Sequence, residues 1–219
     1  MFDVTGSFNI LTDMSIATTV TKTAGAVIYA HSGFHTVFAN LRIDRTPGVT
    51  WYRGIYLDGM NDTHITDVEI RPAGTQSAIY VSGSSMRSED TYIDHLNING
   101  WLNNIELEWS SGAYLSNLDL LSAAHYGVLV DPSSSHEVDG TRASQVLSDS
   151  NAYDGWHFGG SGPITETGLT NCWAATNGYV PGTANYSGFS AGINVSNPNL
   201  NNLSIVGSEF HSNTAQGIY

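Results

Sequence analysis

The chain has 219 residues, of which 41% are hydrophobic and 12% are charged. This composition can fill a packed core, and it excludes a disordered chain, which would be more polar and more highly charged. Twenty acidic residues against seven basic ones give a net charge of −13. That charge excludes ordinary binding to nucleic acid phosphates, because few cations are present to replace the released counterions. No run of the chain approaches the roughly 18 consecutive apolar residues that cross a bilayer, so we expect no membrane insertion.

The residue types favour strands over helices. Lys, Glu and Gln are scarce, whereas 23 glycines and many Ser, Thr and Asn residues are spread evenly along the chain. Helical bundles and alternating βα units need the opposite balance, so this composition indicates an all-β protein.

An internal repeat runs along the whole chain. Its first element spans six positions. They are an apolar residue, two polar residues, a second apolar residue, a residue whose side chain should point outward, and a third apolar residue. Eight copies follow one another, the last three weaker, at Leu11–Ile16, Phe38–Ile43, Ile65–Ile70, Ile93–Ile98, Leu115–Leu120, Ala143–Ser148, Leu169–Ala174 and Ile205–Phe210.

The second element of the repeat is a small residue followed by an apolar, a variable and an apolar position. It occurs at Gly54–Leu57, Ala78–Val81, Asn104–Leu107, Gly127–Val130, Gly155–Phe158, Gly192–Val195 and Gly217–Tyr219. The order of the two elements never changes, and loops absorb the variation in spacing, with one long insertion at 178–190.

This pattern predicts a right-handed parallel β-helix. Alternation with a period of two places apolar side chains inside short strands, and each polar pair turns the chain through a corner. A repeat of roughly 25 residues then forms one coil, stacked about 4.8 Å from the next. We expect about eight coils with three short sheets, in one domain over residues 1–219 that belongs to a longer chain. An antiparallel sandwich or barrel would instead need hairpin turns every 8–12 residues or so.

The coil pattern also resembles a known superfamily. The segments RGIYLDGMNDTHITDVEI and SEFHSNTAQGIY are similar to coils of the pectin-lyase-like β-helices of pectate lyases, polygalacturonases and phage tailspikes. A tailspike that depolymerises polysaccharide is the best match. That resemblance implies a homotrimer on the virion surface (tail) or outside the cell, with a polysaccharide as its partner. The polygalacturonase motifs Asn-Thr-Asp, Asp-Asp and Gly-His-Gly are missing, so no catalytic residue is carried over.

Outward positions of the second element should stack into a column, which we name the first face: Tyr56, Tyr80, Glu106, Leu129, His157, Asn194 and Tyr219. Aromatic rings stack on the apolar faces of sugars, so this column predicts a polysaccharide groove. Its substrate-binding candidates are Tyr56, Tyr80, His157 and Asn194. A surface histidine without a role is the plainer interpretation of His157.

A second column beside it carries further carboxylates, and it reads Asp58, Ser82, Glu108, Asp131, Gly159 and Ser196. Glycoside hydrolysis commonly uses two carboxyl groups, about 5–9.5 Å apart. The catalytic candidates are Glu106, Glu108, Asp131 and Asp58, and stacking at this distance would raise the pKa of one carboxyl by repulsion. In this hypothesis Glu106 or Glu108 protonates the leaving oxygen while Asp131 or Asp58 activates water. The alternative is that these acidic residues serve only solubility.

A second face is formed by the outward positions of the first element: Arg42, Glu69, Asn97, Asp119, Leu147, Trp173 and Glu209. Outward apolar residues at Leu121, Leu147 and Trp173 mark a contact surface, so we expect a subunit interface here. Neither a metal site nor a cofactor is expected.

Three functions remain open. The leading one is recognition and hydrolysis of a cell-surface polysaccharide, and the next is a non-catalytic receptor-binding or structural fibre. A polysaccharide lyase is the least favoured, because β-elimination usually needs a basic group and the sequence predicts no Lys or Arg on the first face.

Overall fold

A computed structural model describes residues 1–71, 74–178 and 190–219 of the chain. Every regular element in these residues is a β-strand, and the elements are numbered β1 to β18. No helix in the described residues is long and apolar enough to cross a membrane. Residues 179–189 of the predicted insertion lie outside the described part of the chain.

Strands at equivalent places in successive copies of the repeat build the sheet that carries the first face. These strands are β1 (Phe2–Ser7), the first part of β3 (Ala26–Arg45), β4 (Arg53–Asp58), β6 (Ser77–Ser82), β8 (Asn103–Leu107), β10 (Val128–Val130), β13 (Trp156–Phe158) and β16 (Ile193–Val195). Each pairs in parallel with the corresponding strand of the next turn.

The other strands complete each turn, and the longer ones bend around its corners. They are β2 (Ile10–Thr18), the rest of β3, β5 (Asn61–Ile70), β7 (Ser88–Asn99), β9 (Ser110–Leu121), β11 (Val138–Asp139), β12 (Arg142–Asp149), β14 (Ile164–Thr170), β15 (Trp173–Ala175), β17 (Leu200–Val206) and β18 (Glu209–His211). These strands are parallel to their neighbours as well.

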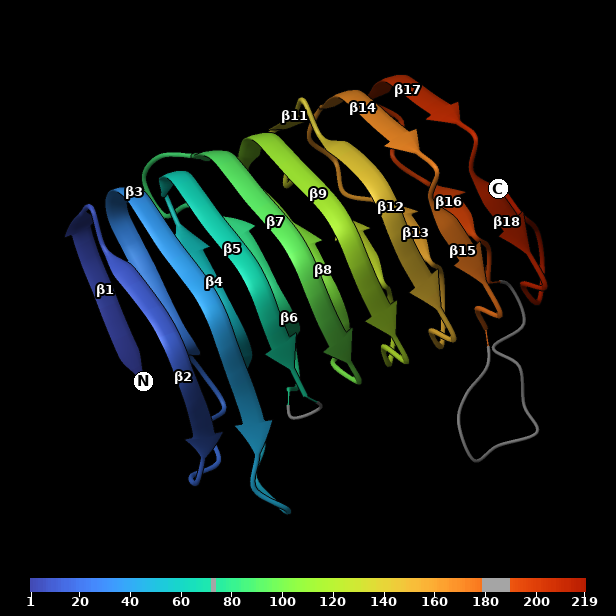
Figure 1. The fold of residues 1–219 in the computed structure, drawn as a ribbon. Helices are drawn as coiled ribbons and strands as arrows, with labels where there is room; N and C mark the ends of the chain where they lie inside the picture. Colours follow the sequence, from blue (N-terminus) through green and yellow to red (C-terminus); the bar gives the residue numbers. More distant parts are fainter. Residues whose placement is uncertain (72–73, 179–189) are drawn as a thin grey trace.

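The result is a parallel β-solenoid, which confirms the predicted fold class. Figure 1 shows successive turns lying side by side from the N-terminal to the C-terminal end. The solenoid has about six turns, slightly fewer than the eight expected. The first and last copies of the repeat form its open ends, because β1 and β2 have a neighbouring turn on one side only, as do β17 and β18.

The polar pair turns the chain because its second residue adopts the left-handed conformation. This residue has φ between 50° and 61° in every copy, at Asp13, Asn40, Asp67, His95, Asn117, Gln145, Asn171 and Gly207. Asn, Asp and Gly tolerate this conformation better than other residues do. The predicted corners are therefore confirmed, and their composition has a conformational cause.

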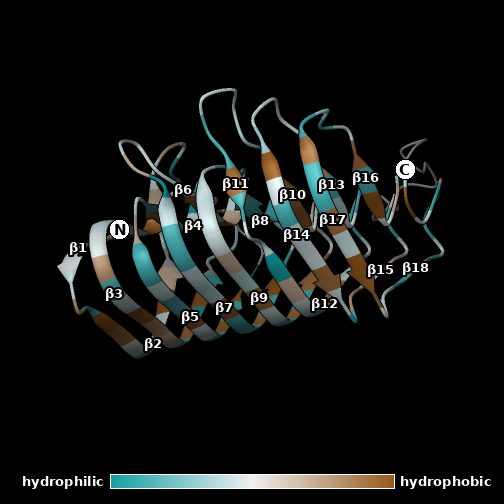
Figure 2. Ribbon diagram, turned by 90° about the horizontal axis from the view of Figure 1, so that it is seen from above, coloured by the Kyte–Doolittle hydropathy of each residue, from teal (hydrophilic) through white to brown (hydrophobic). Residues whose placement is uncertain are grey.

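Inward positions form continuous apolar columns along the solenoid. One of them is fully buried and runs through Ile28, Ile55, Ile79, Ile105, Val128, Trp156 and Ile193. Figure 2 shows the hydrophobic segments recurring at equivalent places from one strand to the next. Each buried aliphatic side chain contributes about 1.5–3 kcal/mol, and it is buried only when a neighbouring turn covers it. Stability is therefore shared between neighbouring turns.

Asparagine side chains link the last turns at a buried corner. Asn151 Nδ2 donates to Asn177 Oδ1 at 2.9 Å, and Asn177 Nδ2 donates to Asn213 Oδ1 at 2.9 Å. The same oxygens accept the backbone N–H groups of Asn151 and Asn177. Each amide thus satisfies the polar groups of the turn beside it, which lets this corner be buried at low cost.

Candidate functional site

The first face has the predicted register. Tyr56, Tyr80, Glu106, Leu129, His157 and Asn194 are direct partners in successive parallel strands. The column also extends toward the N-terminus, where Tyr29 pairs with Tyr56. Side chains about two dozen residues apart in the sequence are therefore neighbours along one line.

Tyrosines at the N-terminal end of this column pack on one another. The ring centroids of Tyr29 and Tyr56 are 5.2 Å apart, and those of Tyr56 and Tyr80 are 4.9 Å apart. The Arg53 guanidinium lies 3.8 Å from the centroid of Tyr80, which is 7% exposed. Tyr80 therefore has little ring surface left for a sugar, whereas Tyr56 is only half-buried.

Arg53 also corrects one prediction. The sequence predicts no basic residue on the first face, but this guanidinium lies against Tyr52, Tyr56 and Tyr80. Arg53 directly precedes the copy of the second repeat element at Gly54–Leu57, and its long side chain reaches across to the neighbouring turns. The absence of a cation therefore no longer argues against a lyase.

Next to Tyr80 the surface is hollowed, and the hollow brings together three of the four predicted catalytic residues. Its volume is about 370 Å³, and it is lined by Tyr80, Glu106, Glu108, Asp131, Pro132, Ser133, Gly160 and Ser161. Glu106 lies on β8, Glu108 follows β8 directly, and Asp131 follows β10 in the next turn. The parallel pairing of β8 with β10 is what places the three carboxyl groups together.

Glu106 occupies the most enclosed position of the three. Its Oε2 accepts a hydrogen bond from Ser77 Oγ and another from Asn103 Nδ2, the latter at 3.2 Å. Burial raises the pKa of Glu106, although these two hydrogen bonds and the charge of Arg53 act in the opposite direction. Desolvation therefore outweighs the local donors at this carboxyl.

At Glu108, in contrast, the hydrogen bonds and a nearby positive charge outweigh the effect of burial on the pKa. Its Oε2 accepts hydrogen bonds from Tyr80 OH and from Ser82 Oγ, the latter at 2.6 Å, and its Oε1 lies 3.2 Å from His136 Nδ1. Burial alone would raise the pKa of Glu108, but the hydrogen bonds from Ser82 and Tyr80 and the charge of His136 together lower it. The His136 ring stacks on Trp109, with centroids 4.4 Å apart, and is thereby held in place.

Asp131 completes the set with a raised pKa. Burial is the main cause, and the negative charge of Glu108 adds to it, while His157 opposes it. Gly159 lies beside this carboxyl, since a Cβ built there would come within 2.9 Å of Asp131 Oδ1. The hollow thus holds one carboxyl whose pKa is lowered and two whose pKa values are raised, and such a separation of pKa values is typical of an acid–base pair.

Asp58 is not part of this arrangement. Its side chain is buried, its Oδ2 accepts from Tyr29 OH at 2.5 Å, and its Oδ1 accepts from Ser84 N–H at 2.5 Å. Both oxygens hold neighbouring parts of the chain together, and Asp58 does not line the hollow.

His157 and Asn194 lie on the C-terminal side of the hollow. His157 Nδ1 is 2.8 Å from Asp154 Oδ2, and Asn194 Nδ2 donates to that oxygen at 3.1 Å. The two predicted substrate-binding residues therefore share one carboxylate, that of Asp154, which was not among the predicted site residues.

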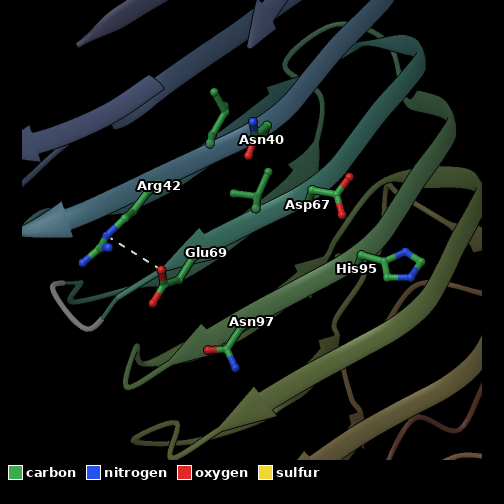
Figure 3. Close-up of a pocket in the computed structure, with 8 residues that line it drawn as sticks. Asn40, Arg42, Asp67, Glu69, His95 and Asn97 are labelled. Carbon is green, nitrogen blue, oxygen red and sulfur yellow. Dashed lines mark ion pairs between the residues drawn. The ribbon is translucent and has the colours of Figure 1, made fainter. Parts of the chain in front are cut away.

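A second hollow, of about 510 Å³, lies on the second face. Figure 3 shows Asn40, Asp67 and His95 at its bend and Arg42, Glu69 and Asn97 beyond them. One of its two acidic groups is already paired: Arg42 Nε lies 3.7 Å from Glu69, and Arg71 Nε lies 2.7 Å from the same carboxylate. Exposed ion pairs of this kind contribute little, and this hollow brings together fewer carboxyl groups than the hollow on the first face, which is therefore the better candidate for catalysis.

The apolar residues of the second face are only partly adjacent. Leu147 pairs with Trp173 in register, whereas Leu121 pairs with Asp149 in the neighbouring column. Trp173 is 41% exposed and contacts the His211 ring edge-on, with centroids 4.9 Å apart. Leu147 and Trp173 therefore form the candidate contact surface.

No group of three or more His, Cys, Asp or Glu side chains within the described residues could hold a metal ion. No family model matches the chain, and no curated protein matches its sequence.

Sequence reasoning missed the partners that set the site's chemistry. The most important of these are Arg53, Ser77, Ser82, Asn103 and His136. Ser82 does occur in the predicted second column beside Glu108, so its contact could have been inferred from the repeat. His136 could not, because it lies in a loop between β10 and β11 whose path does not follow the repeat.

Proposed function

We propose that the protein binds a cell-surface polysaccharide along the first face and hydrolyses it at the hollow between Glu108 and Asp131. The observation that carries this proposal is that the pairing of β8 with β10 brings Glu108 and Asp131 from neighbouring turns into one hollow. The opposite directions of their pKa shifts support it. A parallel β-solenoid is consistent with polysaccharide-related and with structural roles. Membership of the pectin-lyase-like superfamily, a tailspike identity, a virion or extracellular location and a trimeric state belong to the same proposal.

This mechanism exchanges the roles expected from the sequence, because the pKa of Glu108 is lowered and that of Asp131 is raised: Asp131 is the general acid. Its raised pKa keeps the carboxyl protonated to higher pH, so that it can protonate the leaving glycosidic oxygen. Glu108 is the carboxylate that activates water or attacks the anomeric carbon, because its donors keep it ionised. Glu106, enclosed by Ser77 and Asn103, lines the floor of the hollow and binds sugar hydroxyls through its free oxygen.

The decisive experiment replaces each carboxyl with its amide. Wild type, D131N, E108Q and E106Q are incubated with a panel of purified bacterial capsular polysaccharides and O-antigens, and new reducing ends and fragment masses are measured. Removal of a general acid or base costs about 10²–10⁴-fold in rate, so we expect losses of this size for D131N and E108Q. E69Q is the matched control, because Glu69 lines the hollow on the second face.

The pH profile gives a second test of the same assignment. Cleavage needs Glu108 ionised, with its pKa below the ordinary 4.5, and Asp131 protonated, with its pKa above the ordinary 3.8. We therefore expect a bell-shaped profile with its maximum on the acid side of neutrality. Full activity in both D131N and E108Q would refute the mechanism, and ultraviolet absorbance from unsaturated products would identify a lyase. Binding without new reducing ends would support the receptor-binding alternative.

A further inference from the structure

Beyond the hollow, the side chains of a serine, a histidine and an aspartate are linked in a row by hydrogen bonds. Ser196 Oγ is 3.2 Å from His157 Nε2, and the other ring nitrogen, Nδ1, is 2.8 Å from Asp154 Oδ2. Both distances fall within the range of about 2.6–3.2 Å expected between a nucleophile, its base and the group that orients the base. The three residues come from two adjacent turns, since β13 pairs with β16.

Asp154 is built as a fixed orienting group. It is 2% exposed, its Oδ1 accepts the backbone N–H of Ala191 at 2.8 Å, and its Oδ2 also accepts from Asn194 Nδ2 at 3.1 Å. A buried carboxylate with these partners stays in one position and holds the Nδ1–H tautomer of His157, which leaves Nε2 free to accept a proton. Tyr126 stacks on the imidazole, with centroids 4.5 Å apart, and fixes the plane of the ring.

Ser196 has the exposure that a nucleophile needs. It follows β16 directly, its side chain is exposed, and its backbone N–H is anchored on Phe158 O at 2.9 Å. Gly159 lies beside His157, where a Cβ would come within 3.0 Å of Nε2. Glycine at this position therefore leaves room above the imidazole for a substrate.

We propose that Ser196, His157 and Asp154 form a second catalytic site, which hydrolyses acyl esters on the hydroxyl groups of a bound sugar chain. A serine activated by histidine performs acyl transfer, whereas glycoside hydrolysis uses carboxyl groups, so the two sites carry out different reactions. The sugar part of the substrate rests on the proposed function, because the site adjoins Asp131 through Gly159. The ester chemistry rests on the three residues alone.

The reaction balances without any added reactant other than water. Ser196 Oγ attacks the ester carbonyl while its proton passes to His157 Nε2. The bond between the acyl carbon and the sugar oxygen breaks, and His157 returns the proton to that oxygen, which leaves an acyl-serine and a free sugar hydroxyl. Water then attacks the acyl-serine, with His157 first accepting a proton from it and then giving it to Ser196 Oγ. The products are a carboxylic acid and the original enzyme.

The first test uses two small probes and needs no polysaccharide. The purified protein is treated with a fluorophosphonate, with intact mass and peptide mapping as the readout, and its hydrolysis of p-nitrophenyl acetate is followed. We expect one adduct, on Ser196, and ester hydrolysis that falls at least about 100-fold in S196A and in H157Q. Ser134, an exposed serine of the loop after β10, provides the matched control S134A, which should keep the wild-type rate.

The outcomes separate this inference from the proposed function. A protein that forms no adduct on Ser196, or an S196A variant that hydrolyses the ester at the wild-type rate, overturns the inference. S196A removes only an exposed hydroxyl, so loss of folding does not complicate the result. Serine-dependent ester hydrolysis with no cleavage of any polysaccharide refutes the glycoside hydrolase alone. Polysaccharide cleavage without serine-dependent ester hydrolysis refutes the second site alone.

Discussion

Three acidic side chains within one hollow differ because their immediate partners differ. Glu106 is the most enclosed, so burial raises its pKa, whereas Glu108 is held ionised by Tyr80, Ser82 and His136. The same residue type, two positions apart on the chain, thus has opposite preferences for its charge. Residue identity alone does not assign an acid or a base.

These opposite shifts predict opposite effects on stability. The raised pKa of Glu106 stabilises the fold fully below its ordinary value of 4.5, and this contribution is lost as pH rises through the raised value. The lowered pKa of Glu108 stabilises the fold above 4.5, and this contribution is lost as pH falls through the lowered value. As pH rises from about 4 to about 7, we therefore expect the melting temperature of E106Q to rise relative to that of wild type. Over the same range, the melting temperature of E108Q should fall relative to that of wild type.

Thermal unfolding of the two variants at both pH values checks this expectation. Each variant is the control for the other, because both changes remove one carboxylate charge from the same hollow. A shift in the same direction for both would show that net charge, and not the local environment, governs their stability.

At the scale of the strand, the corners decide where each element bends. A left-handed residue occurs at a second corner of each copy of the repeat, where the chain has Phe8, His35, Asp62, Asp90, Gly112, Gly140, Glu166 and Asn202. Most of these positions carry a residue that tolerates positive φ, and the others are held there by the pairing of the strands on either side. Backbone conformation thus limits the sequence at the corners more than side-chain contact does.

The energetic cost of placing a non-glycine residue in the left-handed conformation can be measured at Gly140. Its φ is +66°, and a Cβ there would meet nothing closer than 3.5 Å, so Gly140→Ala introduces backbone strain without a clash. We expect this variant to lose about 1 kcal/mol of unfolding free energy, measured by chemical denaturation. Gly140→Asn should lose clearly less, because asparagine tolerates the left-handed region. Equal losses in the two variants would contradict the explanation.

At the scale of the whole molecule, the two faces offer different surfaces. The first face carries the carboxyl hollow and the serine–histidine–aspartate set, while the second face carries ion pairs and the exposed Trp173 beside the half-buried Leu147. A net charge of −13 opposes binding of anionic polymers at low salt, so the proposed polysaccharide is a neutral one. This division leaves the second face available for other subunits.

The proposed trimer gives a prediction for this second face. Trp173 is large, exposed and next to Leu147, and interface tryptophans commonly contribute about 2 kcal/mol or more. We expect Trp173→Glu to weaken self-association by roughly 30-fold or more, as measured by sedimentation velocity over a concentration series. Glu209, the register partner of Trp173, provides the control E209Q. A wild-type protein that sediments as a monomer would refute the proposal.

The sequence by itself determined the solenoid, the columns of the first face and the corners. Each of these depends on local rules, namely the period-two alternation, the polar pair at the bend and the constant order of the two repeat elements. Because stacked parallel strands have one register, this was enough to place Glu106 beside Leu129 and Tyr80. The three carboxyls of the hollow could be predicted for the same reason.

Only the tertiary structure decided which groups touch. Arg53 reaches the Tyr80 ring, His136 reaches Glu108 from a loop, and Ser196 meets His157 across 39 positions of the chain. Long side chains and loops of unequal length take directions that packing selects, and no repeat encodes them. The position of each residue in the strands and their register therefore follows from the sequence pattern, whereas its side-chain contacts follow from the packing of the folded chain.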